Sequence, residues 1–362
     1  MIPKNLDISL IDKRIMTPCP VGNPYPSTRY QGSKRKIAPW IVDETRHLNY
    51  QSVLDGFCGT CSVAYEFKKI GKEVTCNDIL KSNYITASAL IANSQETLKE
   101  EEVENILGRH DNMNYADFIE RTFKGIYYTD SENRWIDTII QNIQCIENPS
   151  KKALALFALF QSCLIKRPFN LFHRKNLNLR LNHIESAFNN HVTWEKGFDE
   201  FFKKFVHEAN TCIFSNGFKN KALNTDVFDM EETDFDLAYF DPPYISPEGK
   251  SVDYHHFYHF LEGLCDYGVW ERKIDYNSKH LRLESKTNTW IEYKPTIKAF
   301  ERLFRKFQDS IIVVSYRSPG IPSKLTLKTL LEQYKKNVKV TSRPFKYALS
   351  KRSNYEILLI GE

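Results

Sequence analysis

The stretch Phe235-Asp236-Leu237-Ala238-Tyr239-Phe240-Asp241-Pro242-Pro243-Tyr244 joins an apolar run to a polar turn. The apolar part predicts a buried strand, and open α/β sheets bind ligands just beyond the carboxyl ends of their strands. In the turn, Asp241 adds carboxylate acceptors, the two prolines offer carbonyls without N–H donors, and Tyr244 offers a flat face. This combination suits a planar ring that carries an NH2 group, although a structural proline turn with a capping Asp would look the same.

Strand-like runs recur along the chain and alternate with helical patterns. We predict further strands at residues 52–54, 73–76, 211–214, 311–314, 338–340 and 357–360. Helical patterns separate several of them, at residues 62–70, 295–307 and 324–334. This alternation predicts a doubly wound, mostly parallel, Rossmann-like α/β sheet. The last two strands have no clear helix between them, so we expect an antiparallel pair at the C-terminus.

Two intervals depart from this alternation. Residues 84–210 are mostly helical in pattern and too long for a simple crossover, so we expect an inserted subdomain. The sheet domain would then consist of residues 1–83 and 211–362. Residues 247–294 are rich in Tyr, His and charge and directly follow the Asp-Pro-Pro-Tyr turn, so we expect them to cover the site.

The composition is that of an ordinary globular protein. The 362 residues are 41% hydrophobic and 26% charged, enough for one large domain with an insertion. No run of about 18 apolar residues occurs and the N-terminus lacks the form of a signal peptide, so we expect a cytoplasmic protein with no membrane partner. We expect the eight cysteines to be reduced. The net charge of +5 permits an anionic partner without requiring one.

A second candidate ligand-binding motif follows the first predicted strand. Asp55-Gly56-Phe57-Cys58-Gly59-Thr60 opens a helix, and its two glycines suit a tight turn that a ligand approaches closely. Asp78 ends the next predicted strand, where an acid can accept hydrogen bonds from ribose hydroxyls. Together they predict a pocket for an adenosine-containing cofactor. The glycine fingerprint of dinucleotide enzymes is incomplete, which disfavours a dehydrogenase.

Two groups of residues resemble metal sites, but each lacks the residues that would complete one. Cys58 and Cys61 have the spacing of a redox or zinc pair, yet no second close Cys/His pair accompanies them. His255, His256 and His259 have no acidic general-base pattern around them. We therefore expect no metal. The cysteines are interpreted as small buried residues, and the histidines as part of a mobile segment that closes on the site.

In this order, the motifs resemble those of the Dam-like, alpha-class adenine-specific DNA methyltransferases. Tyr30-Gln31-Gly32-Ser33-Lys34 is similar to that family's first motif, Asp55–Gly59 to its S-adenosylmethionine motif, Asn77-Asp78 to its ribose contact, and Asp241–Tyr244 to its catalytic motif. The stretch 345–350 also resembles a segment of this family. Two departures stand out, because Cys61 occupies the place of a third glycine in many members, and Gln31 and Ser33 replace commoner residues.

The resemblance implies S-adenosylmethionine as the cofactor. Asp226 resembles the acid that holds the cofactor's adenine, and Lys34 would lie near its carboxylate. The implied cofactor contacts are Tyr30, Gly32, Lys34, Asp55, Phe57, Cys58, Gly59, Thr60, Asp78, Asp226, Val227 and Asp241.

The resemblance also implies methylation of adenine N6 in a specific double-stranded DNA sequence, with the adenine flipped out of the duplex. Asp241 and the Pro242 carbonyl would accept the two amine hydrogens, Pro243 would help to fix the turn, and Tyr244 would stack on the base. A separately encoded restriction endonuclease of the same specificity, without a stable complex, is an expected partner. The same turn could act on RNA or on a planar amide in a protein, and a methyltransferase fold used only for binding is a further alternative.

The DNA-facing surface is expected in the insertion. Residues 151–190 contain seven Lys or Arg and one acidic residue, and their net charge of +6 exceeds that of the whole chain. Residues 166–176 mix cations, amides and aromatic rings, which suits contacts to phosphates and base edges. The segment could also be a solvated basic loop. The residues that we expect to contact DNA are Lys166, Arg167, Asn170, His173, Arg174 and Lys175.

Overall fold

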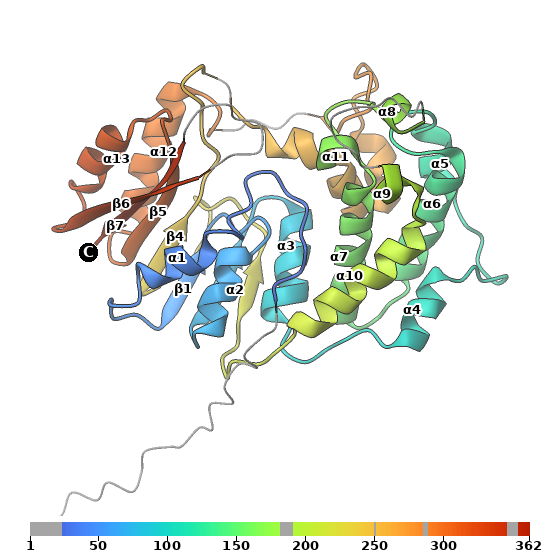
Figure 1. The fold of residues 1–362 in the computed structure, drawn as a ribbon, viewed down its shortest axis with the longest axis horizontal. Helices are drawn as coiled ribbons and strands as arrows, with labels where there is room; N and C mark the ends of the chain where they lie inside the picture. The colour runs from blue at the N-terminus through green and yellow to red at the C-terminus, as the bar shows by residue number, and fades with distance from the viewer. Residues whose placement is uncertain (1–23, 182–190, 250, 285–288, 346–353) are drawn as a thin grey trace, which may run out of the picture.

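The computed structural model describes residues 24–181, 191–249, 251–284, 289–345 and 354–362, and its centre is a seven-stranded sheet with helices on both faces (Figure 1). The strands lie in the order β3-β2-β1-β4-β5-β7-β6. Their bounds are β1 (Ser52–Asp55), β2 (Glu73–Asn77), β3 (Lys221–Leu223), β4 (Leu237–Phe240), β5 (Ile311–Ser318), β6 (Val338–Pro344) and β7 (Tyr355–Gly361).

The sheet is parallel from β3 to β5 and antiparallel at its C-terminal end. β7 runs against both β5 and β6, as expected for the C-terminal strand pair. β1 pairs in parallel with both β2 and β4, so the connections from β1 and from β4 leave the sheet in opposite directions. A doubly wound sheet binds its ligands at such a reversal of strand order, outside the carboxyl ends of the strands. The sheet therefore brings the two predicted motifs, which follow β1 and β4, to one place.

Both faces of β4 are buried, which explains its uninterrupted apolar run. Leu237 and Tyr239 belong to the core on one face, with α1 (Ala38–Asp43), α2 (Ser62–Lys69) and α3 (Lys81–Ala87). Ala238 and Phe240 belong to the core on the other face, with α12 (Tyr293–Lys306) and α13 (Lys324–Leu331). The helices predicted at 62–70, 295–307 and 324–334 are thus confirmed, with small shifts at their ends.

The interval predicted as an insertion is mostly helical where the structure describes it. Its long helix α7 (Pro149–Ile165) packs against α3 and α10 (Phe198–Cys212), so the interval shares one apolar core with the α1–α3 face of the sheet. The division into separate domains stays a prediction. The helices that follow α3 here are η1 (Ser88–Ala92), α4 (Glu100–Leu107), α5 (Phe118–Thr122), α6 (Asp130–Gln144), α7 (Pro149–Ile165), η2 (Pro168–Asn170), α8 (Leu177–Leu181), α9 (His191–Glu195) and α10 (Phe198–Cys212).

One predicted strand is wrong. Residues 211–214 contain the end of α10 and the start of the loop after it, and the sheet is entered later, by the three-residue strand β3. The buried side chains of α10 recur at helical spacing up to Cys212, so the apolar run continues a helix face instead of opening a strand.

The chain after β4 forms two further helices before it reaches α12, namely α11 (Tyr254–Cys265) and η3 (Tyr267–Lys273). The Glu262 carboxylate of α11 accepts hydrogen bonds from the backbone N–H groups of Lys81 and Ser82, at 3.0 and 2.8 Å. α11 is therefore anchored at the first turn of α3, next to the carboxyl end of β2.

The structure bears on membrane crossing and on disulfides only within the residues that it describes. Within the described ranges, no helix has both the length and the apolar character that crossing a bilayer requires. The cysteines in those ranges are free thiols, whereas Cys19 lies outside them.

Candidate functional site

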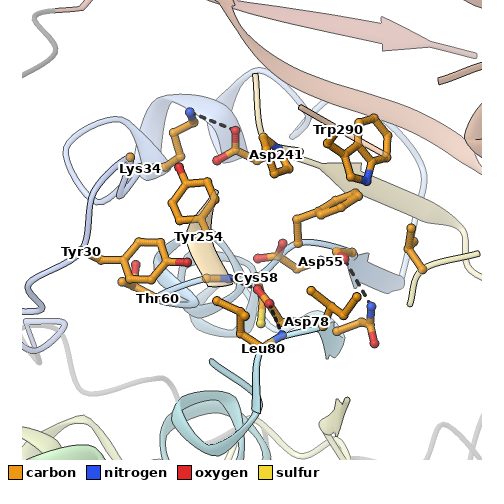
Figure 2. A pocket seen from close by; sticks show the side chains of 18 of the residues that line it. Tyr30, Lys34, Asp55, Cys58, Thr60, Asp78, Leu80, Asp241, Tyr254 and Trp290 are labelled. Atoms are coloured by element: carbon orange, nitrogen blue, oxygen red, sulfur yellow. Dashed lines mark hydrogen bonds and ion pairs between the residues drawn. The ribbon is translucent and has the colours of Figure 1, made fainter. Parts of the chain in front are cut away.

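A single pocket opens at the carboxyl ends of β1, β2 and β4 (Figure 2). Every residue that the sequence predicted as a cofactor contact lines it, and so does Pro243 of the predicted catalytic turn. The remaining lining residues come mainly from the same loops and from the segment after β4: Ser33, Gly56, Ser62, Val63, Asn77, Ile79, Leu80, Thr225, Tyr239, Asp253, Tyr254, His255, Thr289 and Trp290.

Asp78 holds the turn after β1 against the end of β2. Its two carboxylate oxygens accept hydrogen bonds from the backbone N–H groups of Gly59 and Leu80, both at 2.9 Å. Gly59 has a φ of +48°, a conformation that glycine adopts without strain. Burial raises the pKa of Asp78 to about 6, although both backbone hydrogen bonds act to lower it. The carboxylate is thereby fixed at the pocket wall, where its remaining lone pairs can accept from a ligand.

Asp55 ends β1 with a carboxylate that is almost completely buried. Burial raises its pKa well above the usual range for an aspartate. Its Oδ1 has no hydrogen-bond partner among the described residues, although the side chain lines the pocket. Because buried acceptors are normally satisfied, this atom fits a site that receives a donor from a ligand.

Cys61 occupies the place where many members of the resembling family have glycine. Its φ of 60° and ψ of 19° lie in the left-handed region, so the backbone keeps a glycine-like conformation at a cost of about 1–2 kcal/mol. The sulfur atoms of Cys58, Cys61 and Cys76 are buried and lie within 4.8 Å of one another. Sequence spacing revealed only the first two, since β2 brings the third. The expected absence of a metal stays a prediction.

The Asp241 carboxylate shares a lysine with a second carboxylate. Lys34 Nζ lies 3.0 Å from Asp241 Oδ1 and 3.1 Å from Glu356 Oε1. Burial raises the pKa of Asp241 to about 7, the Lys34 ammonium acts to lower it, and the negative charge of Glu356 acts to raise it. Lys34 lines the pocket as expected, but its ammonium pairs with these two side chains. The expected pairing of Lys34 with a cofactor carboxylate therefore has no support here.

Residues from the segment after β4 line part of the pocket, while the covering role expected for this segment stays a prediction. The Tyr254 and Tyr258 rings of α11 stack on Tyr30, with centroids 5.5 and 4.5 Å away. A Cβ atom at Gly32 would lie only 2.7 Å from Tyr254 Oη, so α11 packs tightly on the N-terminal loop. Trp290, further along the chain, meets the Phe57 ring edge to face at 5.3 Å.

Tyr244 and Pro242 lie beside the pocket and do not line it. The Tyr244 ring packs edge-on against Tyr316, with centroids 6.0 Å apart. Two cations lie near the same ring, with Lys34 Nζ 5.8 Å and Arg317 Cζ 5.9 Å from its centroid. Tyr244 is thus next to Asp241 on the side away from the turn after β1.

Comparison with known families matches residues 30–318 to the D12 class N6 adenine-specific DNA methyltransferases. That match covers most of the chain, including β1, β4 and both loops of the pocket. The chain belongs to this family. It transfers a methyl group to the exocyclic N6 amine of adenine in DNA.

Two curated relatives align with this adenine methyltransferase over most of its length and over most of their own. The Type II methyltransferase M2.HphI of Haemophilus parahaemolyticus is 29% identical over 343 residues, which are 92% of this chain and 96% of the relative. The Type II methyltransferase M.CviAII of Paramecium bursaria Chlorella virus 1 is 22% identical over 325 residues, which are 85% and 88%. A solved structure of the rRNA methyltransferase aviRa from Streptomyces viridochromogenes covers 94% of this chain and 90% of its own, but at 11% identity and a TM-score of 0.30 it carries no weight for the fold.

Two of the six residues predicted to contact DNA are buried in this methyltransferase. Lys166 is 3% exposed, and its Nζ donates to the Trp194 and Lys196 carbonyls at 2.5 Å and pairs with Glu132 at 3.1 Å. Arg167 is 2% exposed and donates to the carbonyls of Tyr127, Leu171 and Arg174. The prediction of phosphate contacts is wrong for both, because their charged groups hold interior backbone in place.

The other four remain accessible to different degrees. Arg174 and Lys175 are exposed, while Asn170 and His173 are half-buried. The segment lies against α11, because the Phe172 N–H donates to the Phe257 carbonyl at 3.0 Å. α11 also supplies Tyr254 and His255 to the pocket wall, so the segment is a neighbour of the site.

Proposed function

We propose that this enzyme uses S-adenosylmethionine in the pocket and methylates one flipped adenine within a specific double-stranded DNA sequence. The observation that carries the proposal is the position of Asp241. It follows β4 at the carboxyl edge of the sheet and lines the same pocket as the turn after β1. An acceptor for an amine and a binding loop for an adenosine cofactor are thus within one cavity.

The pocket suits both ends of S-adenosylmethionine. The partnerless buried oxygen of Asp55 can accept from an ammonium, and the fixed carboxylate of Asp78 can accept from ribose hydroxyls. Asp226, Val227 and Trp290 also line the pocket, so a nucleobase could pack on the Trp290 ring and donate to the Asp226 carboxylate. When bound, the cofactor supplies an electrophilic methyl group on a sulfonium.

Asp241 and the Pro242 carbonyl prepare the amine. The N6 lone pair of adenine is delocalised into the ring, and two acceptors that bind its two hydrogens would favour a tetrahedral nitrogen. That lone pair could then accept the methyl group that bound S-adenosylmethionine would supply, and the electrons of the broken S–C bond would stay on sulfur. One N6 proton leaves through Asp241 to water, which balances the charge. Positioning and preorganised acceptors carry this chemistry, without a covalent enzyme intermediate or a metal.

An adenine inside a duplex cannot reach the pocket, so we propose that it is flipped out, at a cost of a few kcal/mol of unstacking. Tyr244 is proposed to stack on the flipped base. Its ring faces the same Lys34 that pairs with Asp241, which supports a base position between the ring and the carboxylate.

The DNA backbone would lie across the segment next to α11. We propose Arg174 and Lys175 as phosphate contacts because they are exposed and close to the covering helix. Asn170 and His173 can contribute polar contacts on the same segment. A separately encoded restriction endonuclease of the same specificity, without a stable complex, is proposed from the Type II relatives. A cytoplasmic location stays a prediction that rests on the DNA substrate.

The substitution Asp241→Asn tests the assignment. It keeps the shape of the side chain but replaces a carboxylate acceptor with an amide, so single-turnover methyl transfer should fall by about 100-fold or more. Binding of S-adenosylmethionine, measured separately by calorimetry, should stay within a few-fold of wild type. Asp236→Asn is the matched control, since Asp236 lies at the opposite end of β4, where its carboxylate accepts from the backbone of Gln51 and from the backbone and hydroxyl of Ser52. Near-wild-type transfer by Asp241→Asn would refute the role.

A further inference from the structure

Glu356 is a fully buried carboxylate at the edge of the site, and no sequence motif includes it. Its relative exposure is 0%, against 4% for Lys34 and 17% for Asp241. It does not line the pocket, so neither cofactor nor base touches it there. It contacts Lys34, whose ammonium lies almost equally far from the Asp241 and Glu356 carboxylates.

The strand β7 holds Glu356 in place. β7 is the antiparallel strand between β5 and β6. In the strand register, the Glu356 backbone lies opposite Arg317 of β5 and Arg343 of β6. The Ser315 hydroxyl donates to Glu356 Oε1 at 2.6 Å. The oxygen that contacts Lys34 is therefore fixed from a second side. A carboxylate held this way has little freedom to move when a substrate arrives.

The geometry of the three groups makes Lys34 a shared donor. Its ammonium lies within ion-pair distance of both the Asp241 and the Glu356 carboxylates. Buried carboxylates and ammonium groups are stabilised when such partners face them. A change at Glu356 therefore acts on Asp241 through the ammonium that both contact.

We propose that Glu356 is a positioning residue for methyl transfer: it shares Lys34 with Asp241, fixes the orientation of the Asp241 carboxylate, and preserves its ability to accept from the amine. This inference rests on the function proposed above. Without the Glu356 carboxylate, the Lys34 ammonium would lose one of these two acceptors and interact more strongly with Asp241, at the lone pairs that the amine needs. With Glu356, the ammonium is held between two acceptors and Asp241 keeps a free edge toward the pocket.

The sharing has a measurable signature in the pH dependence of the rate. The negative charge of Glu356 acts to raise the pKa of Asp241, while Lys34 acts to lower it. Replacing Glu356 with Gln removes the negative charge that raises the pKa of Asp241. It also strengthens the interaction of Lys34 with Asp241, which lowers that pKa. Both changes lower the pKa of Asp241, so the acid limb of the rate profile moves to lower pH. The substitution leaves in place the other ionisable groups near Asp241, which are Asp55, Tyr239, Tyr244 and Tyr254.

The test is the single-turnover rate of methyl transfer to DNA as a function of pH, for wild type, Glu356→Gln and Glu356→Asp. For Glu356→Gln we expect the midpoint of the acid limb to fall by about one pH unit. The plateau rate should fall by about tenfold, because the carboxylate is less well oriented. The KM for S-adenosylmethionine should stay unchanged, since Glu356 lies outside the pocket. Glu356→Asp keeps the charge but reaches less far, so it should keep the midpoint and lower the plateau.

Asp137→Asn is the control for loss of a buried carboxylate elsewhere. Asp137 accepts from the Ile119 and Glu120 backbone and from Tyr267, away from the pocket, and its substitution should leave the midpoint unchanged. A Glu356→Gln profile that overlays the wild type would overturn the inference while leaving the proposed function intact. If Glu356→Gln does not fold, a wild-type plateau for Glu356→Asp would overturn it equally. Failure of the wild type to methylate adenine would instead refute the proposed function.

Discussion

Asp241 lies between opposing influences on its charge. Burial and the Glu356 carboxylate favour its protonated form, the Lys34 ammonium favours the carboxylate, and its pKa is raised to about 7. A proton on Asp241 would compete with the amine for the acceptor. The local charges therefore place the useful form of Asp241 close to neutral pH, where a small change in its partners alters how much of it is present.

The wild-type enzyme should show this ionisation in its pH–rate profile. Since the ionised carboxylate is the form that can take up the amine proton, the single-turnover rate should fall about tenfold for each pH unit below 7 and level off above it. The effect on folding runs the other way, because a raised folded-state pKa means that ionising Asp241 costs stability. The Asp241 contribution to stability should thus improve as pH falls from about 7 toward the usual aspartate range. A rate profile that stays flat through pH 7 would contradict the assignment.

The location of the motif residues could be predicted from the sequence, whereas the side chains that contact them from distant parts of the chain could not. Asp55, Asp78 and Asp241 follow apolar strands, so their place at one sheet edge follows from the strand pattern. Glu356 has no local signal, because β7 and the N-terminal loop bring it to Lys34. Lys166 looked like a solvent-facing cation, yet backbone carbonyls and a carboxylate satisfy it in the interior.

At the scale of elements, the apolar strands were the most predictable. Mostly buried runs form five of the strands, namely β1, β2, β4, β5 and β7. Exposing such apolar runs to water would be unfavourable. β3 escaped detection because three half-buried residues carry no pattern. The false strand at 211–214 arose where the apolar face of α10 ends in a short continuous run, which periodicity alone cannot distinguish from a strand. The expectation that the segment containing α11 covers the site came only from its position after the Asp-Pro-Pro-Tyr turn, and it stays a prediction.

The segment beside α11 makes a prediction about DNA binding. The double substitution Arg174→Gln and Lys175→Gln should reduce the slope of log affinity against log salt by about 0.9 for each phosphate that the protein no longer neutralises. The control is Lys324→Gln with Lys336→Gln, two exposed lysines on and after α13, at the far end of the molecule from α8 (Figure 1). Affinity is measured by fluorescence anisotropy at several salt concentrations. An unchanged slope in the first variant would show that phosphates bind elsewhere.

At the scale of the molecule, one sheet brings distant parts of the chain to one pocket. The turn after β1, the acid after β2 and the turn after β4 all line it, and in the proposed function the first two bind the cofactor and the third accepts the amine. The helical interval packs on one face of this sheet and places the basic segment against α11. The order of the motifs along the chain could not show that the helical interval shares one core with the sheet.

The most direct test of the central claim is the identity of the methylated atom. The wild-type enzyme and Asp241→Asn are incubated with methyl-labelled S-adenosylmethionine and double-stranded DNA, with RNA as a parallel substrate. The DNA is then digested to nucleosides, and the labelled product is separated and identified by mass spectrometry. We predict that the label appears in N6-methyl-deoxyadenosine with wild type and is reduced by about 100-fold or more with Asp241→Asn. Label in a cytosine product, in RNA alone, or at equal levels in both proteins would contradict the account.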